Sequence, residues 1–424
     1  MEIEKMNKIN ESTFRYYGEF EKQKAVMLCW PAEAYSAKGY NVHDVFVEVI
    51  KNLVDEVEVF VNCGVEGSIT TCKEKLLNAG IDISRIQFTQ FTDVSYWARD
   101  YGADILIDDN GNMRLVNFKF NQYGLTDDKE PTSLETAKIA PHQAIELGCF
   151  DIVNSDLISE GGDKEFNGNG VLMTIEDTEV TKRNPQYSKE QVEDEFKRLF
   201  NLEKVIWIPH ATFDDEEILD GILDVVDGEP VYRSESANGH IDEMCRFVNE
   251  NTILLAEVSE EEAEKLNSAQ ITKECLDKAY EVLKNATDIN GKKFKIVRIP
   301  CAEPIYITAE SGDEIYDLWQ WCKELEGATD TLRDGSPFPS GKIKMQPALS
   351  YCNFLIVNGI VLSQSYWKEG LPERIKEKDE QAKKVLETIF PNRKVITINT
   401  TALNILGGGI HCITKNIAHP NGKY

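Results

Sequence analysis

The sequence has no Cys-x-x-Cys pair, no long apolar run and few basic side chains for its size. Because its ten cysteines occur singly, we expect no metal and no structural zinc site of the usual ligand spacing. The best apolar stretch, residues 352–362, is interrupted by Asn-Gly and is shorter than the roughly 18 residues of a membrane span. The 46 basic and 73 acidic residues give a net charge of −27, which disfavours binding to nucleic acid phosphates. We therefore expect neither a nucleic acid nor a membrane as a partner.

The features that are present indicate a globular protein of the cytoplasm. Hydrophobic residues make up 42% of the chain, enough to bury a large core. Residues 1–8 contain no apolar stretch that could act as a signal peptide, and unpaired thiols are typical of a reducing compartment. The excess of acidic residues also favours a cationic small molecule as the ligand.

One order of structural elements recurs along the chain. Residues 170–176 favour a strand, residues 188–200 a helix with a capping box at Ser188 and Gln191, and residues 204–209 a second strand. The same order is expected in four further units, two of them with an Asn-Gly pair typical of a hairpin turn. Their elements are expected at 25–30, 43–54 and 57–62; around Asn110-Gly111, at 134–147 and 150–154; at 241–248, 252–258, 272–285 and 294–300; and at 352–357, 360–364, 377–389 and 394–399.

Five such units predict one α/β domain over residues 1–424, a five-bladed pseudo-symmetric propeller with helices outside and sheets within. Residues 409–417 follow the fifth unit and are expected to complete the sheet of the first, which would close the ring. Irregular insertions at about 214–232, with an acidic run at 214–230, and at 309–345 could be lids or contacts in a homo-oligomer. The order of elements alone also allows an open α/β sheet.

Four short stretches with chemically reactive side chains occupy related places in this repeat. They are Trp97-Ala-Arg99-Asp100-Tyr-Gly102, Glu160-Gly161-Gly162-Asp163, Gly239-His240-Ile241-Asp242 and Gly407-Gly408-Gly409-Ile410-His411-Cys412. In a ring of equivalent units, corresponding strand ends point to a common centre. Residues that are far apart in the sequence are therefore expected to meet there.

The residue types at these places suit nucleophilic catalysis on a cation. On a strand, His240 and Asp242 would face the same side, whereas His411 and Cys412 would face opposite sides, so that only one looks into the cavity. Glycines ahead of Cys412 would let a substrate approach without a Cβ in the way, and a neighbouring imidazolium would favour its thiolate. The carboxylates of Asp100, Glu160 and Asp242 would be costly to bury together without a cation, and a guanidinium matches their geometry.

Each of these residues also has a simpler interpretation. Cys412 could be a small buried hydrophobic residue, and His240 a core histidine paired with Asp242. Asp100 could form a local ion pair with Arg99, Glu160 could be a turn residue, and Trp97 could belong to the core. The occurrence of all four stretches at corresponding positions favours the functional interpretation.

With these motifs the sequence resembles the agmatine deiminase and bacterial peptidylarginine deiminase family of guanidino-group-modifying enzymes. The resemblance spans most of the chain and includes Cys29-Trp30-Pro31, Arg183-Asn-Pro185, Asn238-Gly-His-Ile-Asp242 and Gly407-Gly-Gly-Ile-His-Cys-Ile-Thr414, besides the Trp97 and Glu160 stretches. The fold implied by this resemblance is the pentein fold, a five-bladed α/β propeller.

The resemblance also implies roles for individual residues. Cys412 would be the nucleophile, His240 the acid and base, and Glu160 would assist binding and proton transfer. Asp100 and Asp242 would hold the guanidinium, with Trp97, Gly408 and Gly409 lining the pocket. Attack by Cys412 on the guanidinium carbon, loss of ammonia and hydrolysis of the amidino-thioether would then give a ureido product. No metal or organic cofactor is implied.

The function expected from the resemblance is conversion of agmatine to N-carbamoylputrescine and ammonia. Deimination of arginine or peptidyl-arginine, and transfer of the amidino group to an amine, are the alternatives within this chemistry. Outside it, the chain could be a binding protein on a propeller scaffold, or a zinc protein using His240, Asp242 and Cys412.

Overall fold

The computed structural model describes residues 14–32, 35–36, 38–92, 95–325, 327 and 329–420. Residues 1–13, which include the segment considered for a signal peptide, lie outside this part of the chain, as do residues 326 and 328 within the second expected insertion. None of the helices in the described ranges is long and apolar enough to cross a bilayer.

Five sheets are built on one pattern, in which a central strand pairs with an antiparallel strand on one side and a parallel strand on the other. The second to fifth consist of β4 (Asp104–Ile107), β5 (Met113–Lys119) and β6 (Asp151–Ile158); β7 (Glu165–Phe166), β8 (Val171–Ile175) and β9 (Lys204–Ile208); β12 (Cys245–Asn249), β13 (Thr252–Glu257) and β14 (Lys295–Pro300); and β17 (Leu355–Val357), β18 (Ile360–Ser365) and β19 (Lys394–Asn399). The first consists of β20 (Lys415–Ala418), β1 (Gln23–Cys29), β2 (Glu58–Asn62) and β3 (Ile86–Thr89).

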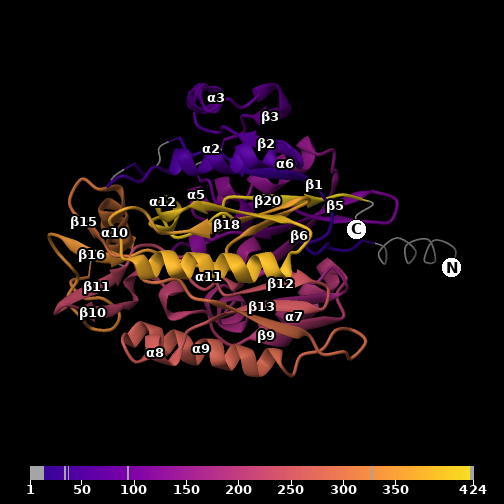
Figure 1. Ribbon diagram of the computed structural model, residues 1–424. Helices are drawn as coiled ribbons and strands as arrows, with labels where there is room; N and C mark the ends of the chain where they lie inside the picture. Colours follow the sequence, from indigo (N-terminus) through magenta and orange to yellow (C-terminus); the bar gives the residue numbers. More distant parts are fainter. Residues whose placement is uncertain are drawn as a thin grey trace.

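A helix connects each parallel pair of strands, because parallel neighbours need a crossover. These helices are α2 (Val42–Leu53), α6 (Ile139–Glu146), α7 (Lys189–Phe200), α9 (Asn267–Leu283) and α11 (Glu373–Ile389), with α3 (Ser68–Asn78), α5 (Pro131–Thr136) and α8 (Glu260–Ala263) beside them. Figure 1 shows α2 and α3 at one end of the molecule and α8 and α9 at the other, with most of the strands between them. The central strands β1, β8, β13 and β18 are almost entirely buried, whereas β5 has only Leu115 and Val116 buried.

Most of the expected elements are confirmed, and two differ for identifiable reasons. The capping box of α7 is formed by Ser188 and Gln191. The helix expected over 134–147 is split into α5 and α6, since Pro141 lacks the N–H that would bond the carbonyl of residue 137. The strand expected from Ile241 begins only at Cys245, because residues 241–243 form a tight 3₁₀ turn, η7 (Ile241–Glu243).

The last strand joins the first sheet, as the sequence predicted. Strand β20 pairs antiparallel with β1, with Ala25 opposite Ile417 and Met27 opposite Lys415. The pairing brings the C-terminal part of the described chain against its N-terminal part (Figure 1). Because Cys412 lies three residues before β20, this pairing also fixes the position of the last reactive stretch.

A further sheet is formed by the two stretches that were expected to be insertions. It consists of β10 (Asp224–Val226), β11 (Glu229–Arg233), β16 (Ile343–Gln346) and β15 (Ile307–Ala309), and it lies at one edge of the molecule (Figure 1). Helix α10 (Glu314–Leu325) packs beside it, and the buried Trp319 donates its indole N–H to the carbonyl of Arg233 at 3.1 Å. Residues 309–345 are therefore only partly irregular.

We predict that Ile417→Ala destabilises the protein by about 2–5 kcal/mol, because it empties part of a fully buried site between β20 and its neighbours. Urea unfolding measures the loss. Ile145→Ala, at a position 49% exposed on α6, should change the stability by less than about 0.5 kcal/mol. Equal effects of the two substitutions would contradict the importance of the β20 pairing.

Candidate active site

The reactive stretches identified in the sequence lie directly ahead of the antiparallel strand of each sheet. Asp100 is on the short helix α4 (Ala98–Tyr101) before β4, and Glu160 precedes the turn η3 (Gly161–Asp163) before β7. His240 directly precedes η7 and Asp242 lies in it, before β12, and Cys412 lies in the turn before β20. The fifth position, before β17, is held by Asn353, which the sequence analysis did not select although the same repeat pointed to it.

Gly162 is the point where three of these side chains meet. Its N–H donates to Oδ1 of Asp100 at 3.0 Å. A Cβ at this position would lie 2.8 Å from Oδ1 of Asp100 and 3.2 Å from Oδ2 of Asp242, and would collide with the ring of His240. Glycine is therefore required here by close approach, and the structure brings His240, Asp100 and Asp242 together.

The imidazole of His240 is fully buried between two carboxylates. Nδ1 lies 3.6 Å from Oδ1 of Asp100, and Nε2 lies 3.6 Å from Oε2 of Glu160. Burial alone would lower the pKa of His240, but the charge of Asp100 and the contact with Glu160 raise it to about 10. His240 is therefore an imidazolium at neutral pH.

Glu160 is held by an arginine that the sequence analysis quoted without assigning it a role. The Nε–H of Arg183 donates to both carboxylate oxygens of Glu160, at 2.8 and 3.0 Å, and both side chains are fully buried. Burial would raise the pKa of Glu160, but the guanidinium and His240 bring it down to about 2. Arg183 thus keeps Glu160 ionised beside the imidazolium.

Asp100 has a weaker set of partners. Its Oδ2 accepts the hydroxyl of Tyr123 at 2.9 Å, in addition to the Gly162 N–H on Oδ1. Burial is the main reason why the pKa of Asp100 is raised. A cationic ligand would stabilise the ionised form of this carboxyl.

Cys412 lies against the same cluster. Its Sγ is 3.9 Å from Oδ2 of Asp242 and 3.7 Å from Oε1 of Glu243, and it accepts an N–H from Nδ2 of Asn353 at 3.0 Å. Burial and the charges of Asp242 and Glu243 raise the pKa of the Cys412 thiol well above its usual value. The cysteine is therefore a thiol when no cation is bound.

The three glycines ahead of Cys412 allow close contacts within the protein itself. Gly407 has a φ of +99°, which disfavours other residues. A Cβ on Gly408 would lie 2.7 Å from the ring of the half-buried Trp97 and 3.1 Å from Sγ of Cys412. A Cβ on Gly409 would lie 2.6 Å from Oδ1 of Asn353. These glycines thus bring Trp97, Cys412 and Asn353 together.

Two expectations about side-chain direction were wrong. His240 and Asp242 do not lie on a strand, since His240 directly precedes the 3₁₀ turn η7 and Asp242 lies within it, although both still reach the cluster. His411 and Cys412 do not diverge, since residues 411–413 form a turn: Nδ1 of His411 bonds Oδ2 of Asp242 at 2.5 Å, the same oxygen that faces Cys412.

His411 links Asp242 to Glu19, a residue that belongs to none of the sequence motifs. Nε2 of His411 bonds Oε2 of Glu19 at 2.7 Å. Burial would raise the pKa of Asp242, but the hydrogen bond and charge of His411 lower it. Asp242 is therefore ionised beside the sulfur.

A metal-like spacing occurs in this cluster but without His240. Asp242, Glu243 and Cys412 have ligand atoms within 4.8 Å of one another. Nδ2 of Asn353 donates to both Oε1 of Glu243 and Sγ of Cys412, and His411 holds Asp242. These groups are thus organised by hydrogen bonds, and the zinc set considered from the sequence is not the one brought together.

Comparison with known proteins finds relatives that match most of the chain. A putative agmatine deiminase of Selenomonas ruminantium is 28% identical over 94% of each chain. An agmatine deiminase of Stutzerimonas stutzeri is 28% identical over 81% of this chain and 79% of its own.

Solved structures show the fold. The agmatine deiminase of Enterococcus faecalis has a TM-score of 0.72 at 24% identity, covering 97% of this chain and 99% of that one. A putative arginine deiminase from Porphyromonas gingivalis has a TM-score of 0.68 at 21% identity, covering 97% and 100%. The model of the Porphyromonas-type peptidyl-arginine deiminases matches residues 15–227 and 219–418, and the chain therefore belongs to this family.

Proposed function

We propose that this protein is a hydrolytic deiminase of a small guanidino compound, with agmatine as its substrate and N-carbamoylputrescine and ammonia as its products. We further propose that the five equivalent sheets form one five-bladed propeller over residues 1–424, acting in the cytoplasm. The cysteines at 63, 72, 149, 245, 275, 301, 352 and 412 are free thiols, which supports a reducing compartment.

A single observation carries this proposal: a thiol, an imidazolium and an excess of buried carboxylates share one centre. Cys412, His240, Asp100 and Asp242 are each nine-tenths or more buried. Oδ1 of Asp242 has no hydrogen-bond partner among the residues that the structure describes, nor does either ring nitrogen of His240. A planar cation with several N–H donors is the ligand that satisfies such a centre.

The first half of the reaction follows from these charges. A guanidinium held by Asp100 and Asp242 offsets the carboxylates that keep the Cys412 thiol protonated, so the thiolate forms next to its target. The sulfur then attacks the guanidinium carbon, with the Asn353 amide donating to it. His240 gives its proton to the departing nitrogen, and ammonia leaves.

The second half uses the same groups in reverse. His240, now neutral, takes a proton from water as the oxygen attacks the amidino-thioether carbon. Collapse of this adduct breaks the C–S bond and releases the ureido product. Glu160, fixed by Arg183, holds the imidazole in place throughout, and Trp97 covers the cluster next to Gly408.

The choice of agmatine over arginine rests on Glu235, two residues beyond β11. Its Cγ lies 2.6 Å from the position that a Cβ on Gly407 would take, so it is close to the glycine turn of the site. Its Oε2 is buried without a hydrogen-bond partner in the described chain, and burial with Glu217 nearby raises the pKa of Glu235 to about 8. Such a carboxyl ionises when an amine at the far end of the substrate binds beside it, and it offers no comparable partner to the carboxylate of arginine.

We predict that Cys412→Ser lowers the rate of ammonia and ureido product formation from agmatine to background, because a serine hydroxyl is not ionised in this acidic environment. Arginine and arginyl peptides are tested in parallel. Cys275→Ser, on the half-buried face of α9, is the matched control and should retain full activity. Release of ammonia from none of these compounds by the wild type, or an active Cys412→Ser variant, would refute the proposed function.

We predict that Glu235→Gln lowers kcat/KM for agmatine by roughly 10–100-fold, the value of about one charge-assisted hydrogen bond. The same substitution should lower kcat/KM for arginine less, so the ratio of kcat/KM for agmatine to that for arginine should fall. Glu229→Gln makes the same substitution at an exposed position and should leave kcat/KM for agmatine and for arginine unchanged. If this ratio is unchanged in Glu235→Gln, another residue selects the substrate.

We predict that deimination declines as the pH rises through about 10, where His240 loses its proton. The sign follows from the raised pKa of His240, which keeps the acid form present at all lower pH values. Glu160→Gln removes one of the carboxylates that raise it, so the alkaline limb of the kcat/KM profile should move to lower pH. If Glu160→Gln is folded and its alkaline limb does not move, the limb reports the titration of a group other than His240.

A further inference from the structure

The proposed reaction leaves one proton without an acceptor. His240 already carries its proton before the reaction, so it cannot also take the proton of the Cys412 thiol. Among the described residues, Sγ of Cys412 has two carboxylate acceptors: Oδ2 of Asp242 at 3.9 Å and Oε1 of Glu243 at 3.7 Å. Asp242 is occupied by His411 and, in the proposed function, by the substrate. Glu243 is the remaining acceptor.

Glu243 is held toward the sulfur by Asn353. Oδ1 of Asn353 accepts the backbone N–H groups of His411 at 2.9 Å and Cys412 at 3.3 Å, which fixes the orientation of the amide. Its Nδ2 consequently faces the other way, and donates to Oε1 of Glu243 at 2.8 Å and to Sγ at 3.0 Å. One amide group therefore aligns the carboxyl oxygen with the sulfur.

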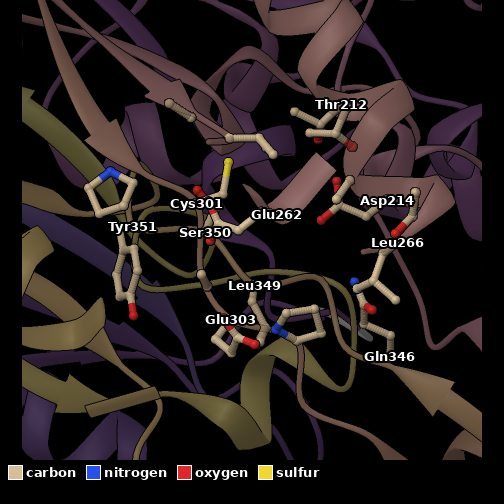
Figure 2. Close-up of a pocket in the computed structure, with 18 of the residues that line it drawn as sticks. Thr212, Asp214, Glu262, Leu266, Cys301, Glu303, Gln346, Leu349, Ser350 and Tyr351 are labelled. Carbon is tan, nitrogen blue, oxygen red and sulfur yellow. The ribbon is translucent and has the colours of Figure 1, made fainter. Parts of the chain in front are cut away.

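Glu243 also lines a cavity that the proposed reaction does not use. This cavity of about 100 Å³ lies between residues 256–304 and 346–352, and Asp214 reaches it from a third side. Figure 2 shows the side chains of Asp214, Glu262 and Glu303 around it. At roughly 10–15 Å³ for each water molecule, it has room for several, with polar groups on its walls to hold them.

We propose that Glu243 carries the proton of Cys412 between the sulfur and the solvent of this cavity, an inference that rests on the proposed deiminase function. Bound guanidinium first lets the neutral Glu243 carboxyl release its own proton to a cavity water. The S–H bond then breaks as an O–H bond forms at the ionised Oε1, and the electron pair stays on the sulfur. When the product leaves, the expelled thiolate takes a proton back by the same route.

The acid strength of Glu243 suits this transfer. Burial and the neighbouring Asp242 raise the pKa of Glu243 well above its usual value. A carboxyl of raised pKa is a stronger base once ionised and is closer in acidity to a thiol, which favours proton exchange between them. Bound guanidinium offsets the charge of Asp242 and so favours loss of a proton from the Cys412–Glu243 pair.

The test compares Glu243→Gln and Glu243→Ala with the wild type on the guanidine that the wild type deiminates. Glutamine keeps the size of the side chain and the bond to Asn353 but cannot pass a proton. We expect kcat to fall at least about 100-fold with KM changed less than about threefold, the usual size of a proton-transfer contribution. Thermal unfolding confirms that each variant is folded.

Chemical rescue separates proton transfer from a structural role. Glu243→Ala leaves a space that opens to the cavity, and formate is small enough to fit it. Formate should therefore restore kcat of this variant at least about tenfold. Formate should not accelerate Glu243→Gln or the wild type, and chloride at equal ionic strength should rescue neither variant. Full activity of Glu243→Gln, or a defect that formate cannot relieve in folded Glu243→Ala, would overturn the relay while the proposed function stands. An inactive wild type would overturn both.

Discussion

Buried negative charge without enough fixed positive charge is the constraint on which this structure depends. Asp100, Glu160, Asp242 and Glu243 all lie within the protein, where each ionised carboxyl costs several kcal/mol unless it is paired. Arg183 forms an ion pair with Glu160, and His411 hydrogen-bonds Asp242. The charges of these carboxylates raise the pKa of His240, and burial together with Asp242 and Glu243 raises the pKa of the Cys412 thiol. In the proposed function, His240 is therefore protonated before the substrate binds, whereas Cys412 ionises only when a cation binds, so that substrate binding and activation of the thiol are a single electrostatic event.

The repeated architecture is what concentrates these groups. Each of the five equivalent sheets has its reactive residue just ahead of its antiparallel strand, so residues as distant as Asp100 and Cys412 come together. Short turns such as η3 and η7 hold them, and glycine at 162 and 408 removes the Cβ atoms that would keep the side chains apart. Pairing of β20 with β1 anchors the final turn, which ties the position of the sulfur to the stability of the first sheet.

Periodicity in the sequence was sufficient for the elements but not for the directions of side chains in turns. The helix after Ser188 and the hairpin at Asn110-Gly111 follow from local patterns and are confirmed, and of residues 409–417, expected to complete the first sheet, those from 415 onward pair with β1. The relation of His411 to Cys412 was wrong, because an extended backbone was assumed where the chain turns. Asn353 could have been found from its place in the repeat. Glu19 and Glu243 could not, since their partners are set only by the packing of distant turns.

In the proposed function, the residues that react and the residue that selects the substrate belong to different parts of the molecule. The cluster around Gly162 is fixed by the five equivalent sheets, whereas Glu235 follows β11 of the additional sheet. That end of β11 is held by α10, where Trp319 donates to the carbonyls of Arg233 at 3.1 Å and Ser234 at 3.3 Å. Substitutions beneath α10 can therefore move Glu235 without touching the thiol or the imidazolium. If Glu235 meets the far end of the substrate as proposed, changes in the additional sheet can alter substrate choice while the guanidine chemistry stays the same.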